Sequence, residues 1–203
     1  MQNASEMPQP RTVSGRRTPV VTMSLSAVAI VMVFLSTLLF QLPIPSTNGY
    51  FNFGDIMIFI FAFTFGPVIG GISGAVGSSL SDALGGFGTF APFTFAIKGL
   101  EGLLAGLVSQ RQFRGRVILG WIAGSLVMVV GYFLAESFLI SLVFGSSEFT
   151  GIVAASGELP LNILQVVAGG LVGIPLSLTL KRLLKQTPYY YKLMGTATSD
   201  KKI

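Results

Sequence analysis

The stretch that decides the fold is VVTMSLSAVAIVMVFLSTLLF, residues 20–40. It contains no charged residue, and as an α-helix it would be about 31 Å long, which matches the hydrocarbon thickness of a bilayer. The stretch is too long for the apolar core of a signal peptide, and it follows a polar segment that carries Arg11, Arg16 and Arg17. We therefore predict an uncleaved membrane-spanning helix.

The rest of the chain has a similar composition. Of its 203 residues, 51% are hydrophobic and 10% are charged, and the mean hydropathy is +0.74. A soluble domain carries about 25% charged residues, so this chain belongs in a bilayer. At about 20 residues per crossing, its length holds about five to seven helices and no second domain. We predict an all-α integral membrane bundle over residues 20–185, with cytoplasmic tails at 1–19 and 186–203.

Five more apolar segments follow the first one, at residues 53–65, 68–84, 92–109, 116–144 and 158–180. The pair Gly66-Pro67 ends the second segment, so the second and third are predicted to form a hairpin of short helices. Whether these two segments cross fully or re-enter on one side remains open. Loops are predicted at 41–52, 85–91 and 145–157, and the C-terminal tail is expected to fray.

The positive charges outside the six segments all lie on the same side of the predicted topology. No Lys or Arg occurs in the loops after the first, third and fifth segments, whereas basic residues occur before the first, after the fourth and after the last. By the positive-inside rule, six crossings then place both termini in the cytoplasm and the chain in the cell membrane. The same distribution explains the net charge of +5 without a nucleic-acid partner, because no basic face on a soluble surface is predicted.

The composition also argues against several kinds of chemistry. Cysteine and histidine are absent, which removes disulfides, thiol nucleophiles, imidazole bases and the commonest metal ligands. The sequence has no G-x-x-x-x-G-K-[ST] phosphate loop and is not expected to hydrolyse ATP by itself. We predict no catalytic residue, no metal and no cofactor. A membrane enzyme using Asp82, Glu101 or Glu136 as an acid or base, and a carrier or channel working without an ATPase, are the alternatives.

Polar residues within the apolar segments are the strongest functional signal. Charges in hydrocarbon are costly and usually face an internal cavity. Lys98 and Glu101 lie three residues apart on one helix face, and Glu158, Asn162 and Gln165 recur at i, i+4 and i+7 on another. By the predicted topology these residues all fall in the outer half of the membrane. The sequence therefore predicts a polar cavity that opens to the outside and is closed towards the cytoplasm.

Each of these residues also has a structural alternative. Asp55 follows Gly54, and its position is that expected for a helix N-cap. The alternative for Asp82 is that it faces water, and the alternative for Lys98 and Glu101 is that they form a structural ion pair. Aromatic residues are candidates for stacking on a flat ligand, although most aromatics in a bilayer pack or face lipid. They are Phe93, Phe95, Trp121, Tyr132 and Phe133, of which Trp121 is predicted to be an interface anchor.

Pairs of glycines four residues apart occur in four of the segments. This spacing lets another backbone approach the helix closely, and we favour packing inside the bundle over docking of a second protein. The pairs are Gly70/Gly74, Gly102/Gly106, Gly120/Gly124 and Gly169/Gly173.

Several motifs occur in a fixed order between residues 49 and 106. They are GYFNFGDIMIF at 49–59, Gly66-Pro67 with Gly70, Gly71 and Gly74, SDALGG at 81–86, PFT at 92–94 and IKGLEGLLAG at 97–106. Together they resemble the substrate-binding S components of energy-coupling-factor vitamin importers, and in particular the riboflavin-type branch with its hydroxymethylpyrimidine- and pyridoxine-like carriers. The resemblance covers about residues 20–185.

The resemblance implies a six-helix bundle that captures a scarce water-soluble vitamin or precursor from outside, with the loop after the first helix as a lid. It implies as partners membrane lipid, a transmembrane coupling subunit and two ABC-type ATPases. The predicted substrate-binding residues are Asn52, Asp55, Phe93, Lys98, Glu101, Glu136, Glu158, Asn162 and Gln165. The family docks its coupling subunit through small residues on the first helix, typically two alanines four apart. Here Thr22 and Ser26 keep that spacing, and with Ala27 they are the predicted docking residues.

Overall fold

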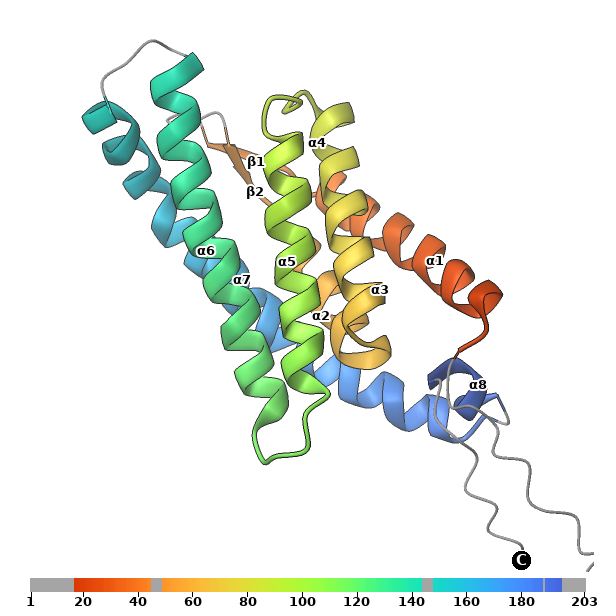
Figure 1. The fold of residues 1–203 in the computed structure, drawn as a ribbon. Helices are drawn as coiled ribbons and strands as arrows, with labels where there is room; N and C mark the ends of the chain where they lie inside the picture. Colours follow the sequence, from red (N-terminus) through yellow and green to blue (C-terminus); the bar gives the residue numbers. More distant parts are fainter. Residues whose placement is uncertain (1–16, 45–48, 144–147, 188, 195–203) are drawn as a thin grey trace, which may run out of the picture.

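The structure is a computed structural model that describes residues 17–44, 49–143, 148–187 and 189–194. It is a bundle of helices with one small antiparallel hairpin at one end (Figure 1). The helices are α1 (Pro19–Leu38), α2 (Gly54–Phe65), α3 (Pro67–Ile72), α4 (Ser79–Gly85), α5 (Ala91–Ser109), α6 (Arg116–Val143), α7 (Glu148–Lys185) and α8 (Tyr190–Met194), and a π-helical turn η1 (Ser73–Ser78) joins α3 to α4.

Within the described part of the chain, four helices have the length and apolar composition to cross a membrane: α1, α5, α6 and α7. The helix α2 is apolar but has only 12 residues. Gly66 follows its last residue and has a φ of 99°, a value that suits glycine. Pro67 then starts α3 in the opposite direction, as the hairpin prediction requires. The unbroken run from α3 through η1 to α4 matches the third predicted segment.

Three parts of the chain differ from the sequence prediction. Residues 41–52 contain the strands β1 (Leu42–Ile44) and β2 (Gly49–Phe51), which pair antiparallel with Pro43 opposite Tyr50. The loop predicted at 145–157 is wrong from residue 148 onward, because α7 starts there. Gly151 in this first part lies directly against Ser137 of α6, so packing stabilises a helix that local composition does not favour.

The third difference is α8, in the tail that was expected to fray. Its Leu193 carbonyl accepts a 2.6 Å hydrogen bond from Arg17 Nε, and Met194 packs on the apolar cluster around Phe65. Residues 1–16 and 195–203 of the two predicted tails lie outside the described part of the chain.

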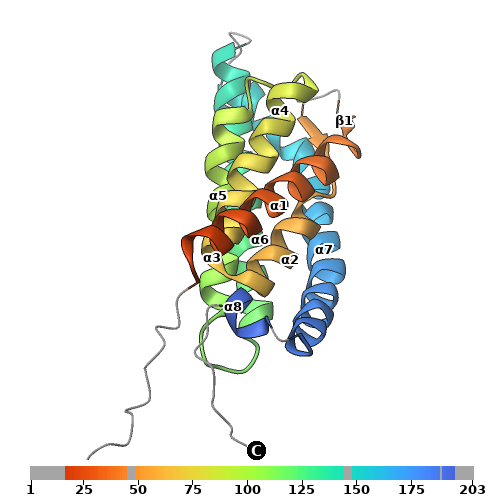
Figure 2. The ribbon, with the colours of Figure 1, turned by 90° about the vertical axis from the view of Figure 1, so that its right-hand side faces the viewer.

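The glycine pairs pack inside the bundle, as predicted. A methyl group built on Gly102 of α5 would collide with the Gly70 carbonyl of α3, and one on Gly124 of α6 would lie 3.0 Å from the Glu101 carbonyl oxygen. Gly169 and Gly173 of α7 likewise contact α2. These close backbone approaches pack α3 and α6 directly against α5. In Figure 2, α3 and α5 lie together on one side of the bundle and α7 lies on the other.

Candidate functional site

A cavity lies beside β2, between α4, α5, α6 and α7. Its empty volume is about 370 Å³, including the part open to solvent. Polar and aromatic side chains make up most of its wall. The lining residues are Tyr50, Asn52, Asp82, Phe87, Phe90, Thr94, Met128, Tyr132, Glu136, Glu158, Asn162 and Gln165.

The polar stripe of α7 forms one wall of this cavity. Glu158, Asn162 and Gln165 are 2%, 7% and 3% exposed, and all three line the cavity, as their helical spacing predicts. Glu136 of α6 faces the stripe and interacts with Glu158 and Asn162. Two carboxyl groups from different helices therefore lie side by side in the wall.

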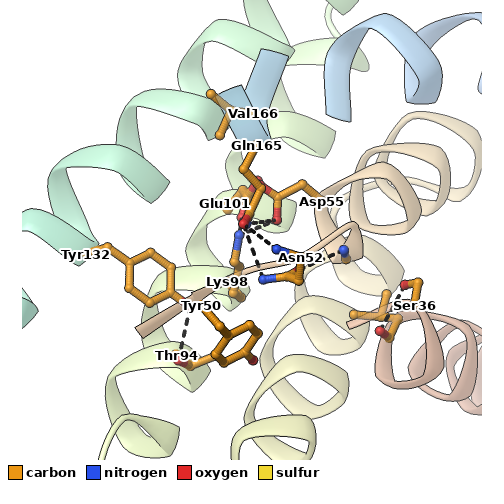
Figure 3. A network of polar contacts seen from close by, with 12 residues as sticks. Ser36, Tyr50, Asn52, Asp55, Thr94, Lys98, Glu101, Tyr132, Gln165 and Val166 are labelled. Carbon is orange, nitrogen blue, oxygen red and sulfur yellow. Dashed lines mark hydrogen bonds and ion pairs between the residues drawn. The ribbon is translucent and has the colours of Figure 1, made fainter. Parts of the chain in front are cut away.

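Gln165 connects the wall to the neighbouring elements (Figure 3). Its Oε1 accepts hydrogen bonds from the Asn52 backbone N–H at 3.0 Å and from Asn52 Nδ2 at 3.3 Å, and its Nε2 donates to Asp55 Oδ1 at 3.2 Å. The Asn52 Oδ1 accepts the N–H of Gly54 at 2.8 Å. This network fixes the end of β2 and the start of α2 against the middle of α7.

A buried cluster of three charges, which we call the floor, contacts Gln165 but is not among the residues that line the cavity. Lys98 Nζ bonds to the Asp55 carboxylate and, at 3.0 Å, to Glu101 Oε2, and none of the three side chains is more than 2% exposed. The pairing of Lys98 with Glu101 is therefore confirmed. The N-cap interpretation of Asp55 is wrong: the N-cap residue of α2 is Phe53, and Asp55 lies inside the first turn, where its carboxylate pairs with the buried ammonium.

The hairpin is fastened over the cavity by contacts with α4 and the turn after it. The Tyr50 hydroxyl donates a hydrogen bond to the Asp82 carboxylate, and the centres of the Tyr50 and Phe87 rings lie 4.5 Å apart. Gln41 Nε2 donates to Ser81 Oγ at 3.1 Å. Burial and the charge of Asp82 raise the pKa of Tyr50 above its usual value, so the hydroxyl keeps the proton that it donates. Asp82 is 1% exposed, which contradicts the alternative that it faces water.

The aromatic predictions are met only in part. Tyr132 lines the cavity and its hydroxyl lies 3.0 Å from Thr94 Oγ1. Phe93 does not line the cavity, because it points to the α6 side of α5 and packs on Phe138. Tyr50, Phe87 and Phe90 line it instead; they lie in or beside glycine-rich loops, where periodicity gives no signal.

Two further predicted residues have other surroundings. Trp121 is half-buried and donates from Nε1 to the Val166 carbonyl at 2.8 Å, so it joins α6 to α7. On α1, Ala27 is exposed whereas Ser26 is 7% exposed and faces the bundle. The docking residues Thr22, Ser26 and Ala27 therefore do not form one outward face.

The fold and the cavity define a helical membrane protein that binds a small polar ligand at one end of its bundle. Residues 17–182 match the family model described as "ECF-type riboflavin transporter, S component". The chain belongs to this family of energy-coupling-factor S components, as its motifs indicate.

Relatives of known name agree with this assignment. The chain is 30% identical to the thiamine precursor transporter HmpT of Lactococcus lactis subsp. cremoris (strain MG1363) over 161 residues, which cover 79% of this chain and 87% of that protein. It is 27% identical to the riboflavin transporter RibU of Staphylococcus aureus (strain TCH60) over 174 residues, covering 80% and 89%. An uncharacterised protein of Pyrococcus woesei is 40% identical over 151 residues, covering 74% and 95%.

The fold also agrees with a solved structure. The chain matches one described as "Structure and mechanism of the S component of a bacterial ECF transporter" with a TM-score of 0.61 and 25% identity, over 82% of this chain and 96% of that one. The all-helical membrane fold predicted from the sequence is thus that of an S component.

Proposed function

We propose that this chain captures a water-soluble vitamin or vitamin precursor from outside the cell and holds it for import by an energy-coupling-factor transporter. The observation that carries this proposal is the cavity under the β1–β2 hairpin, whose wall combines hydrogen-bonding groups and aromatic rings. Such a cavity suits a small polar heterocycle. Riboflavin, pyridoxine and hydroxymethylpyrimidine are the candidate ligands, as the sequence resemblance implies. Two named relatives are transporters of riboflavin and of a thiamine precursor.

The predicted binding residues divide into two groups with different roles. Asn52, Glu136, Glu158, Asn162 and Gln165 line the cavity and are proposed to contact the ligand. The cluster of Asp55, Lys98 and Glu101 lies beneath and is proposed to orient Gln165 from below. Phe93 is left without a role in binding.

The hairpin is proposed to be the lid of the site. Its side-chain hydrogen bonds through Tyr50 and Gln41 go to Asp82 and Ser81 of α4 and not to the charge cluster, so breaking them would open the cavity without disturbing that cluster. Release of the lid would then be the step that admits or frees the ligand.

For the topology, we propose six crossings with both termini and the two tails in the cytoplasm. The β1–β2 hairpin, whose Tyr50 lines the cavity, lies towards one end of the bundle, whereas the α5–α6 loop and α8 lie at the other (Figure 1). That second end carries the exposed Arg111, Arg114 and Arg116 and the basic end of α7. The positive-inside rule then places the cavity on the outer side of the membrane.

The proposed partners are a transmembrane coupling subunit and two ABC-type ATPases, with this chain having no enzymatic turnover of its own. The exposed side of α1, which includes Ala27 and Val28, is the proposed docking surface. Ser26 would support that surface from inside the bundle instead of contacting the partner.

The test is mass spectrometry of small molecules released from the full chain purified in mild detergent. We expect a stoichiometric vitamin-like compound in the wild type and its loss in a Glu158→Ala, Asn162→Ala double variant. A Lys185→Ala variant, changed at an exposed position at the other end of α7, should keep it. Purified protein that carries no such compound and binds no vitamin in a direct titration would refute the proposal. Uptake by vesicles that contain this chain without any ATPase would instead support a stand-alone carrier.

A further inference from the structure

Two open hollows lie next to each other on the surface of the bundle. The polar hollow lies between the start of α1, the turn from α2 to α3, the end of α5 and α8. It is lined by Arg17, Thr22, Phe65, Pro67, Val68, Gln110 and Met194. The apolar hollow lies between α3, η1 and α5, and Val68 lines both hollows. None of their lining residues lines the cavity beside β2, so they form a separate site.

Arg17 gives the polar hollow a positive charge without a negative one beside it. Its Nε donates a 2.6 Å hydrogen bond to the Leu193 carbonyl oxygen, and its guanidinium carbon lies 5.9 Å from the centre of the Phe65 ring. Within the described part of the chain, the ion pairs are those of Lys98, and no acid lines the hollow. Burial lowers the pKa of Arg17 below its usual value, but an arginine remains charged at neutral pH. The half-buried guanidinium therefore favours an anion beside it.

The other polar side chains of this hollow suit a phosphate group. Gln110 and Thr22 line it with an amide and a hydroxyl, both of which can donate hydrogen bonds. In the described part of the chain Arg17 bonds to Leu193 through Nε, which leaves the two terminal NH₂ groups for oxygen acceptors. The planar fork of a guanidinium matches the oxygens of a phosphate. The polar hollow therefore has the chemistry of a phosphate-ester site.

The apolar hollow suits a hydrocarbon chain. Val68, Ile72 and Val76 line it at a spacing of four residues, and the distance from the first to the last is roughly 12 Å at 1.5 Å per residue. Half of the hydrocarbon thickness of a bilayer is about 15 Å, so the hollow follows most of one leaflet. Gly71 and Gly99 also line it, where any other residue would add a side chain. All of its lining residues are apolar: Val68, Gly71, Ile72, Ala75, Val76, Phe95, Gly99 and Leu103.

The two hollows follow one another in the order of the parts of a membrane lipid. The polar hollow includes Met194 of α8, which lies at the same end of the bundle as the basic α5–α6 loop (Figure 1). From that end α3 runs beside α5, and the apolar hollow follows the two helices (Figure 1). The cation of Arg17 therefore lies at the membrane surface, and the apolar hollow lies within the hydrocarbon.

We propose that the two hollows together bind one anionic phospholipid. Its phosphate accepts hydrogen bonds from Arg17 and lies beside Gln110, and one acyl chain lies in the apolar hollow. A phospholipid fits both hollows, since it joins a phosphate to long apolar chains, and the basic end of the bundle attracts anionic headgroups. The lipid belongs to the leaflet on the side of the α5–α6 loop, which the proposed topology makes the cytoplasmic one. The site is independent of the vitamin cavity.

The test is native mass spectrometry of the full chain in mild detergent, titrated with lipids that share their acyl chains. Dioleoylphosphatidylglycerol is compared with dioleoylphosphatidylcholine. We expect one phosphatidylglycerol per chain, bound at least about fivefold tighter than phosphatidylcholine, which is about 1 kcal/mol. Dihexanoylphosphatidylglycerol, whose chains are too short for the apolar hollow, should bind at least about tenfold more weakly than the dioleoyl lipid. Glycerophosphoglycerol, the headgroup without chains, should not displace the dioleoyl lipid at a tenfold excess.

Variants separate the two hollows. Arg17→Gln should abolish the preference for phosphatidylglycerol, whereas Arg17→Lys should keep part of it. Arg114→Gln removes an exposed charge from the same end of the bundle, outside both hollows, and should keep the full preference. Gln110→Glu places a carboxylate in the polar hollow and gives a second reading if Arg17→Gln does not fold. Val76→Phe adds a ring in the apolar hollow and should weaken both dioleoyl lipids alike.

Several results would overturn the inference. Equal binding of the two dioleoyl lipids would mean that the site does not select an anion. A preference that survives both Arg17→Gln and Gln110→Glu, or that Arg114→Gln reduces as much as Arg17→Gln does, would mean that a diffuse basic surface attracts the lipid. Displacement by glycerophosphoglycerol would point to a soluble phosphate ester instead. A chain that retains no lipid would leave the hollows to a protein partner.

Discussion

Replacing Lys98 with methionine takes the cation out of a buried cluster and leaves two carboxylates behind. The Lys98 Nζ lies 3.0 Å from Glu101 Oε2 and also bonds to Asp55, and the side chains are 2% and 0% exposed. Removing one partner of such a buried pair costs about 3–5 kcal/mol. For a chain of this size about 1 kcal/mol corresponds to about 2–4 °C, so the unfolding temperature should fall by roughly 6–20 °C.

The measurement is thermal unfolding of the purified protein in one detergent, followed by far-ultraviolet circular dichroism. Lys185→Met, at an exposed position near the end of α7, is the matched control and should stay within about 2 °C of the wild type. The triple variant Asp55→Asn, Lys98→Met, Glu101→Gln removes all three charges. It should recover part of the lost stability, since it leaves no unpaired charge in the cluster, whereas the single variant leaves two.

Two results would contradict this reasoning. A Lys98→Met protein that unfolds within about 2 °C of the wild type would mean that Asp55 and Glu101 do not depend on the ammonium group. A triple variant as unstable as the single one would mean that the packing of the lysine stem, and not its charge, stabilises the floor.

Three other substitutions test separate parts of the structure. Gly102→Ala should destabilise the bundle by about 1–3 kcal/mol in the same thermal assay, because the added methyl group meets the backbone of α3. Gly157→Ala is the control: Gly157 has open space around it, so this change should be neutral or stabilising by up to about 1 kcal/mol. Equal effects of the two changes would refute the packing argument. Tyr50→Phe should speed ligand release about tenfold through loss of the hydrogen bond to Asp82. Since the pKa of Tyr50 is raised in the folded protein, that bond should contribute fully below about pH 10 and be lost only as the pH rises through the higher folded pKa. The rate of ligand release should therefore not change between pH 6 and pH 8. A wild type that releases its ligand faster at pH 8 than at pH 6, with no such change in Tyr50→Phe, would contradict this expectation. Trp121→Phe should cost about 0.5–1.5 kcal/mol in the thermal assay through loss of the bond to α7, and an unchanged unfolding temperature would refute that role.

The candidate site was predictable where it depends on helical periodicity. The spacing of Glu158, Asn162 and Gln165 places them on one face of α7, and that of Lys98 and Glu101 on one face of α5, whatever the rest of the fold does. The site was not predictable where it depends on loops. Tyr50, Phe87 and Phe90 reach the cavity because strand β2 packs against the loop between α4 and α5.

The sequence by itself determined that the chain is a helical membrane protein, where most of its helices begin and end, and which family it belongs to. Length, apolarity and charge placement act locally along the chain, so they can be read without knowing what packs on what. Only the tertiary structure decided that Asp55 pairs with Lys98 instead of capping α2, that Phe93 turns away from the cavity, and that α7 starts at Glu148. In each case a neighbouring helix supplies the deciding partner. Helix α5 supplies the ammonium group that pairs with Asp55, and α6 supplies both the ring that packs on Phe93 and the surface on which the start of α7 packs.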